Sequence, residues 1–124
     1  MSDPTEGTVG WFALGTGTVG ITEGQTFRLS VVNLGCRNIT VLCGVWQNPN
    51  LRQDSFTLQP GESKDCDLPA ADIPKEQFDK TGRVQIRAFV RSSDRTLVGN
   101  VEVFDNKTGR TTIVLALRDL GSHC

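Results

Sequence analysis

The feature that most constrains the fold is an alternation of apolar and polar side chains, which is clearest in RVQIRAFVR at residues 83–91. One parity of this segment consists of Val84, Ile86, Ala88 and Val90. The other parity is polar except for Phe89. Successive side chains of a β-strand point to opposite faces, so the segment is predicted to be a strand with one face in a core.

Segments of the same period recur along the chain, separated by turn residues. They span residues 8–14, 18–22, 25–33, 38–47, 54–59, 63–68, 96–104 and 111–118. Residues 48–53 are predicted to be a loop, and residues 69–82, which do not alternate, a crossing loop with one helical turn at 75–78. Short strands at such intervals, without a long amphipathic helix, predict an all-β antiparallel sandwich of seven to nine strands, with a jelly roll as the alternative.

The length and composition fit a single domain over residues 1–124, since 37% of the side chains are hydrophobic and 22% are charged. We expect one or two strands in an N-terminal segment, residues 1–24, and a flexible tail at residues 119–124. No apolar run reaches the roughly 18 residues of a membrane helix, and a net charge of −1 argues against nucleic-acid binding. The start lacks signal-peptide features, so we expect a chain that is cytoplasmic, or at the cell surface after processing.

The segment RVQIRAFVR and the following TLVGNVEVF align as a hairpin across the loop SSDR. Pairing Arg91 with Thr96 places apolar side chains opposite one another on the inner face, and a one-residue slip would disrupt this division. The inner pairs are Val90–Leu97, Ala88–Gly99, Ile86–Val101 and Val84–Val103. This register predicts that Phe89, Val98 and Phe104 share one outer face.

The register of the last strand, residues 111–118, depends on the turn that contains Gly109. A four-residue turn would place Val114 opposite Val101, whereas a bulge at Gly109 would turn the other parity inward. We favour the bulge. It sends Ile113, Leu115 and Leu117 to the core. In either register the strand has apolar groups on both faces.

The outer face supplies a candidate interface. It consists of Phe89, Val98, Phe104 and Arg87. These side chains could pack under residues 69–82 or the N-terminal segment, contact a second copy or another partner, or stack on a ligand; large exposed apolar patches usually mark contacts. Arginines at 83, 87 and 91 around Phe89 could hold a nucleic-acid backbone. We favour a solvated, ion-paired sheet face, because the chain is acidic overall.

The four cysteines are Cys36, Cys43, Cys66 and Cys124. No CxxC occurs, and the single histidine, His123, lies in the tail, so the spacing of a zinc site is absent. We favour buried free thiols, with one internal disulfide or a metal site as alternatives, because Cys43 shares the parity of its apolar neighbours. Cys124 is expected to be exposed and is the candidate thiol for a bond between chains, unless GSHC is a remnant of cloning.

Catalytic chemistry has few candidate residues. A single histidine near the C-terminus is poor material for a nucleophile–base pair, and the chain contains no tyrosine. Asp65, Asp67 and Asp72 could bind calcium weakly, but they complete no metal-loop pattern, and a solvated acidic edge is favoured. We therefore expect a protein that is not an enzyme, with no cofactor and no metal site.

Two segments carry a resemblance to a known family. GQTFRLSVVNLG, from Gly24 to Gly35, is followed by FTLQPGES, from Phe56 to Ser63. Together with RVQIRAFV they resemble the bacterial immunoglobulin-like accessory domains of surface proteins, over about the middle half of the chain. The resemblance implies an immunoglobulin-like sandwich that serves as a spacer or interaction domain, without catalytic residues.

These observations predict a structural or interaction protein that acts by self-association into an oligomer or larger assembly. The reasons are strands that are apolar on both faces, a candidate linking thiol at Cys124, and the lack of catalytic parts. The alternative is a ligand-binding module for a carbohydrate, calcium or an anionic partner, which would use an outer sheet face or the loops. A protein or carbohydrate partner is compatible with either function; a nucleic acid and a membrane span are not expected.

Overall fold

The computed structural model describes residues 12–47 and 50–121 of the chain. These residues form ten strands and two short 3-10 helices. The strands are β1 (Phe12–Gly15), β2 (Val19–Thr22), β3 (Gln25–Asn33), β4 (Ile39–Gln47), β5 (Asn50–Leu58), β6 (Ser63–Pro69), β7 (Arg83–Ser92), β8 (Leu97–Asp105), β9 (Thr111–Ala116) and β10 (Arg118–Gly121). The helices η1 (Ala70–Asp72) and η2 (Lys75–Gln77) lie between β6 and β7, where one helical turn is predicted.

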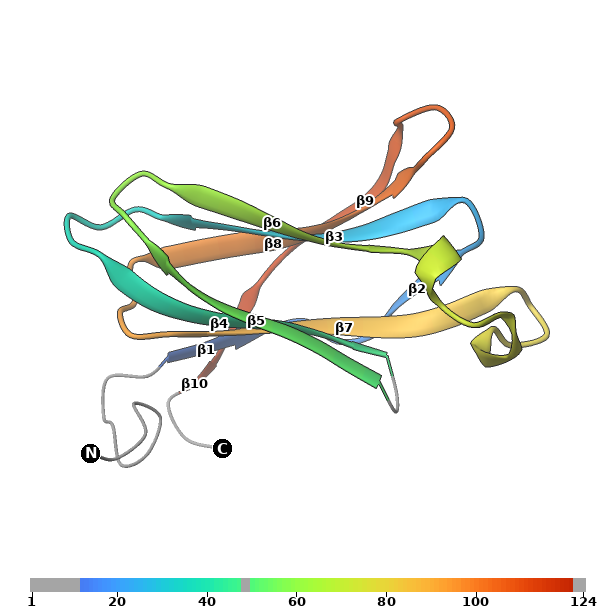
Figure 1. Cartoon of the computed structure of the whole chain (residues 1–124), viewed down its shortest axis with the longest axis horizontal. Coiled ribbons are helices and arrows are strands. Elements are labelled where there is room, and N and C mark those ends of the chain that lie inside the picture. Colours follow the sequence, from blue (N-terminus) through green and yellow to red (C-terminus); the bar gives the residue numbers. More distant parts are fainter. Residues whose placement is uncertain (1–11, 48–49, 122–124) are drawn as a thin grey trace.

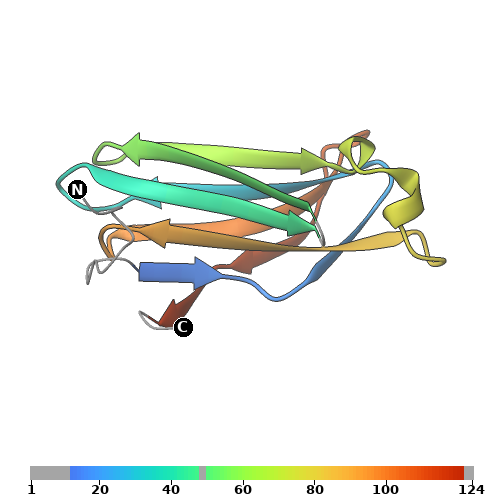
Figure 2. The ribbon, with the colours of Figure 1, turned by 60° about the horizontal axis from the view of Figure 1, so that its bottom comes forward.

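Two antiparallel sheets pack against each other, so the predicted all-β sandwich is confirmed (Figures 1 and 2). The large sheet has the order β10-β1-β7-β4-β5, and β2 also pairs with β7. The small sheet has the order β6-β3-β8-β9. β5 already begins at Asn50, so the prediction of a loop over residues 48–53 is wrong from that residue onward, and 48–49 lie outside the described residues.

The core is built from the inward parity of both sheets. The apolar parity of β7 is buried from Val84 to Val90, as its alternation predicts. Fully buried members of the core include Ile21, Phe27, Leu29, Val41, Ile86, Val90, Val101 and Val103. Cys43 belongs to the same core, which confirms its predicted burial, whereas Cys36 is exposed.

β7 and β8 do not pair, and the predicted hairpin is wrong. β7 pairs with β1, β2 and β4 in the large sheet, while β8 pairs with β3 and β9 in the small sheet. The inward parities of both strands are nevertheless correct, because Val90 and Leu97 are both buried. A link of four residues reaches about 13 Å, enough to cross the roughly 10 Å between packed sheets. Side chains predicted to lie side by side therefore face each other across the core.

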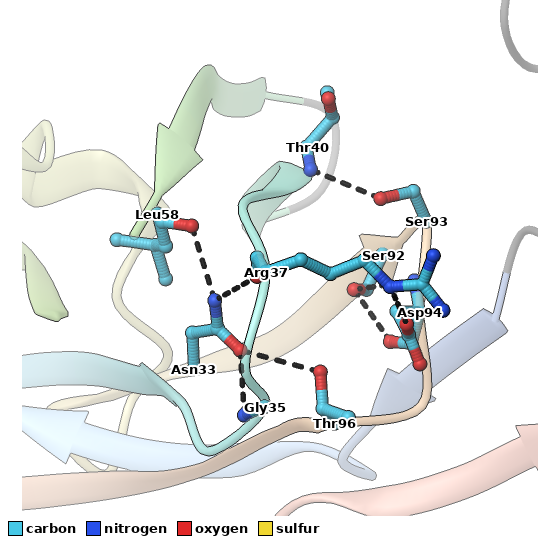
Figure 3. A network of polar contacts seen from close by, with 9 residues as sticks. All are labelled: Asn33, Gly35, Arg37, Thr40, Leu58, Ser92, Ser93, Asp94 and Thr96. Atoms are coloured by element: carbon cyan, nitrogen blue, oxygen red, sulfur yellow. Dashed lines mark hydrogen bonds and ion pairs between the residues drawn. The ribbon is translucent and has the colours of Figure 1, made fainter. Parts of the chain in front are cut away.

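A buried amide fixes the loops at the end where this crossing occurs (Figure 3). The side chain of Asn33 is fully buried, and its Nδ2 donates to the carbonyl oxygens of Arg37 (2.9 Å) and Leu58 (3.1 Å). Its Oδ1 accepts from the amide of Gly35 (2.9 Å) and the hydroxyl of Thr96 (3.2 Å). One side chain thus connects the β3–β4 loop, the end of β5 and the β7–β8 link, with its hydrogen-bonding capacity used on both sides.

The predicted register of β9 is confirmed, but the shift that produces it lies at Thr112 and not at Gly109. The register shifts between Val103 and Phe104, and Gly109 adopts a φ of 74° in the turn. Leu115 then lies opposite Val101, on the inward parity. The whole of β9 is nevertheless exposed, so the prediction that its apolar side chains enter the core is wrong for β9 itself.

Beyond β9 the chain crosses to the other sheet. Leu117 is half-buried against the core, its amide donates to the carbonyl of Gly99 (3.0 Å), and β10 then pairs with β1 in the large sheet. The flexible tail predicted from residue 119 is therefore a strand as far as Gly121, while residues 122–124 lie outside the described part. β1 is consequently enclosed between β7 and β10.

Candidate functional site

The outer face of the large sheet carries Phe89 and Arg87, two of the four predicted interface residues. The Phe89 ring covers Gly44 of the adjacent strand, since a Cβ at Gly44 would lie 2.3 Å from two ring carbons. Phe89 is therefore half-buried on its own sheet. The guanidinium carbon of Arg87 lies 4.5 Å from the ring centroid of Trp46, which is a cation–π contact.

Arginines dominate the charge of this outer face. Arg83, Arg87 and Arg91 are exposed, and none of them forms a side-chain ion pair within residues 12–47 and 50–121. The prediction that the arginines of this face form ion pairs is therefore wrong within the described residues. Outward positions of β4 and β5 next to these arginines carry neutral side chains, such as Leu42 opposite Ser55. The outer face of the large sheet is therefore electropositive, and the rings of Phe89 and Trp46 lie among its arginines.

Val98 and Phe104 lie on the outer face of the other, small sheet. Val98 is 45% exposed, and Phe104 is half-buried below Arg28, whose guanidinium carbon is 4.9 Å from the ring centroid. Arg28 also makes two hydrogen bonds to Asp67, at 2.7 and 2.8 Å, which raise the pKa of the guanidinium. The four predicted interface residues are thus divided between opposite faces and form no common patch, because β7 and β8 belong to different sheets.

Among the side chains that the structure describes, the largest concentration of exposed apolar groups lies on β9. Ile113, Val114 and Leu115 are 36%, 59% and 42% exposed, respectively. We call these three residues, with the unpaired backbone beside them, the β9 edge. Among the described strands, β9 pairs only with β8, so its other side is open. Figure 1 shows the turn between β8 and β9 projecting beyond the neighbouring strands.

The open side of β9 presents backbone groups that can accept a further strand. The amide of Leu117 bonds to Gly99, and Leu115 lies opposite Val101 in the same register. Since antiparallel ladders alternate in direction, Val114 and Ala116 direct their N–H and C=O groups to the open side. The β9 edge therefore combines free ladder groups with apolar side chains on both faces.

The sequence predicts two-sided apolar character for this strand but not its exposure. The signal is the uncharged run TTIVLAL between Arg110 and Arg118. Edge strands usually carry charges, prolines or bulges that discourage pairing with other chains. The uncharged run therefore indicates a site for pairing with another chain only once the strand order shows that β9 lies at the edge of its sheet.

The other predicted site residues do not come together. Asp65 and Asp67 lie beside Arg28, whereas Asp72 approaches Arg52 with its Oδ2 3.3 Å from Nη2. Within the described residues no group of three or more acidic, cysteine or histidine side chains could hold a metal ion. Cys124 lies outside the described residues. None of the helices in the described part is long and apolar enough to cross a membrane.

Comparison with known proteins supports the fold alone. No protein-family model matches the sequence, and no curated protein matches it. The structure is similar to a solved one described as "Crystal Structure of Thermotoga maritima 1070", with a TM-score of 0.60 and 12% sequence identity. The match covers 86% of this chain and 91% of the other. An identity this low supports a shared sandwich architecture and carries no activity from one protein to the other.

Proposed function

We propose that this chain is a non-enzymatic interaction protein that works by self-association, and that two copies pair along the β9 edge. The observation that carries the proposal is the absence of charge on β9. The outermost strands β5, β6 and β10 all carry charged side chains, among them Arg52, Lys64 and Arg118. β2 also lacks charge, but its apolar side chains, Val19 and Ile21, are buried.

A second copy fits this edge by symmetry. With a two-fold axis through Val114, the strand TTIVLA meets itself in antiparallel register, and Val114 lies opposite Val114 of the second copy. Ile113 then lies opposite Leu115 of the second copy, so each face of the joint gains apolar contacts. Val114 and Ala116 direct their backbone groups toward the new strand, as the register of β8 and β9 requires. Cross-strand apolar pairs of this kind contribute roughly 0.2–1 kcal/mol each.

The outer faces of the sandwich offer a further contact for a larger assembly. The outer face of the large sheet carries arginines that form no ion pair in the described part of the chain, while the small sheet carries Asp65, Asp67 and Glu102 around a single Arg28. Opposite charges on two faces of one molecule favour stacking of copies in one direction. This contact would weaken with salt, whereas the apolar β9 pairing would not.

The experiment is the molar mass in solution of three proteins, by light scattering and sedimentation over a concentration series with reductant. Val114→Lys places a charge at the centre of the β9 edge and is expected to give a monomer. Thr57→Lys, an exposed outward substitution on the other sheet's outermost strand β5, is the matched control and should keep the mass of the unmodified chain. A monomeric unmodified chain at high concentration, or an assembly unchanged by Val114→Lys, would contradict the proposal.

A second function, binding of an anionic carbohydrate, rests on the electropositive outer face of the large sheet. Arg87 and Arg91 are exposed there and form no ion pair within residues 12–47 and 50–121, and the partly exposed ring of Trp46 lies beside Arg87. Heparin is a suitable probe in a thermal-shift titration, because a ligand that binds only the folded state raises Tm. The stabilisation should be lost in Arg87→Ala/Arg91→Ala and retained in Arg110→Ala. No shift, or an equal shift in both variants, would exclude this function.

A further inference from the structure

Two cysteines from different sheets meet inside the sandwich. Cys43 lies on β4 of the large sheet and Cys66 on β6 of the small sheet, 23 residues apart, and their Sγ atoms are 3.1 Å apart. Cys43 lies on the buried parity of β4, and Cys66 lies on the same parity as the buried Leu68. The two thiols therefore face each other across the core. A disulfide requires about 2.05 Å, so a movement of about 1 Å would join them.

The pair lies on the side of the sandwich where charged side chains replace apolar packing. Cys43 is opposite Asp54 of β5, and Lys64 precedes Cys66 on the same parity of β6. The Nζ of Lys64 is 3.8 Å from Oδ2 of Asp54 and 4.7 Å from the ring centroid of Phe56. An exposed ion pair thus covers this side, and the side chains of both partners are about half exposed. Ion pairs of this kind are weak and open readily to water.

The two thiols differ in access to solvent. Cys43 is 2% exposed, whereas Cys66 is half-buried at the edge strand. A dissolved reagent can therefore reach the sulfur of Cys66 first, with the sulfur of Cys43 directly behind it. This is the arrangement of an attacking thiol and a resolving thiol.

The protonation states match this order. The two sulfurs share one hydrogen bond, and this contact raises the pKa of Cys43 and lowers that of Cys66. The ammonium group of Lys64 also lowers the pKa of Cys66, while burial and the carboxylates of Asp54 and Asp67 oppose this. Of the two thiols, the more accessible Cys66 is therefore the one that loses its proton more readily. Thiolates, not thiols, attack disulfides.

We propose that Cys43 and Cys66 are a redox-active pair that closes into a disulfide between the two sheets when it meets a low-molecular-weight disulfide. The thiolate of Cys66 attacks one sulfur of the reagent RSSR, forming a mixed disulfide and releasing RS⁻. The sulfur of Cys43 then attacks the sulfur of Cys66, the S–S bond to the reagent breaks, and a second RS⁻ leaves. The proton of Cys43 passes to one leaving thiolate. Two protein sulfurs are oxidised and one RSSR is reduced to two thiols.

The disulfide would join β4 to β6 on the side of the molecule that is otherwise covered by the Lys64–Asp54 ion pair. It would also close a loop between residues 23 positions apart, which restricts the unfolded chain. The oxidised protein is therefore expected to be more stable than the reduced one, without a change of fold.

The experiment uses the full chain with Cys36→Ser and Cys124→Ser, so that only the pair remains. After treatment with oxidised glutathione, peptide mapping should find a Cys43–Cys66 cross-link and an intact mass lower by two hydrogens. Tm should rise by several degrees and return after dithiothreitol. Added Cys43→Ser should stop the reaction at one glutathione adduct on Cys66, and added Cys66→Ser should give no adduct under the same conditions.

The unmodified chain provides an internal reference, because its exposed Cys36 should accept glutathione during the same treatment. If Cys36 reacts while both Cys43 and Cys66 remain available to alkylation after unfolding, the pair is a packing feature and the proposal is wrong. A glutathione adduct that persists on Cys66 while Cys43 is present would also overturn it. Neither outcome depends on whether the protein self-associates.

Discussion

The ring of Phe89 lies on Gly44 of the neighbouring strand, in the space that any side chain at Gly44 would occupy. The small residue Gly44 therefore leaves room for the large ring of Phe89 on the outside of the large sheet. The ring packs against β4 of the same sheet. Sheets commonly place an aromatic ring over a glycine on the adjacent strand, since the ring protects the bare backbone from water.

Gly44→Ala is expected to destabilise the fold by about 1–3 kcal/mol, because the new methyl group would displace the Phe89 ring. In a Phe89→Ala background the same substitution should be neutral or stabilising by about 0.4–1 kcal/mol, because Gly44 does not have a positive φ. Chemical denaturation of the four proteins in a double-mutant cycle measures the coupling. An equal cost of Gly44→Ala in both backgrounds would show that the ring is not responsible.

Asn33→Asp is expected to destabilise the protein in a pH-dependent way. The substitution removes the donor to two carbonyl oxygens and buries a carboxyl, whose pKa should therefore rise above about 3.9. When the pKa of a carboxyl is higher in the folded than in the unfolded protein, the free energy of unfolding is highest at a pH below the unfolded-state pKa. It decreases as the pH rises through the folded-state pKa. The loss relative to the natural chain should thus be smaller near pH 4 than near pH 7.

The matched control for this prediction is Asn100→Asp, because Asn100 is exposed on β8. Urea denaturation of both variants at the two pH values gives the comparison. If the losses of unfolding free energy in Asn33→Asp and Asn100→Asp change with pH in the same way, the buried hydrogen bonds of Asn33 do not cause the pH dependence.

Gly109→Ala should cost about 1–2 kcal/mol through backbone strain alone, because Gly109 has a φ of 74° and a Cβ there would meet no other atom within 4 Å. Gly17→Ala is the control, since it also has open space around its Cβ but no positive φ. Hydrogen exchange should show faster opening of β9 in Gly109→Ala only. Faster exchange in both variants would indicate a general loosening of the chain.

The accessible thiol should react at a lower pH than an ordinary cysteine. The alkylation rate of Cys66 in the Cys36→Ser/Cys124→Ser chain is expected to reach half its maximum below about pH 8.5, the usual thiol value. Cys43→Ala removes the shared hydrogen bond and should move this midpoint upward, as should Lys64→Gln, since both groups lower the pKa of Cys66. An unchanged midpoint in Cys43→Ala would show that the two sulfurs do not interact.

The alternation of side chains predicts the inward face of each strand but not its neighbour. Val90 and Leu97 are both buried, as their parity requires, yet they belong to different sheets. A hairpin and a crossing of the sandwich bury the same side chains, so periodicity cannot distinguish them. The wrong hairpin placed Phe89 and Val98 on one face. In the structure Phe89 lies on β7 of the large sheet and Val98 on β8 of the small sheet, so the candidate interface is divided.

The thiol pair and the β9 edge could not be predicted for a related reason. The parities of Cys43 and Cys66 both indicate an inward position, but their contact depends on which strand of one sheet lies over which strand of the other. Likewise the parity that places Leu115 opposite Val101 follows from the apolar pattern of the strand, whereas the exposure of Leu115 depends on β9 being outermost. Both sites depend on long-range strand order, which local sequence does not encode.

The position of β1 between β7 and β10 has a consequence for biosynthesis. A growing polypeptide emerges in sequence order, so β1 leaves the ribosome long before the strand that borders it on one side. Until β10 follows, the large sheet lacks that flank, and the small sheet lacks β9. The sandwich must therefore be completed after nearly the whole described chain has been made, and a chain truncated near residue 110 would leave open the sides of β8 and β1 that β9 and β10 cover.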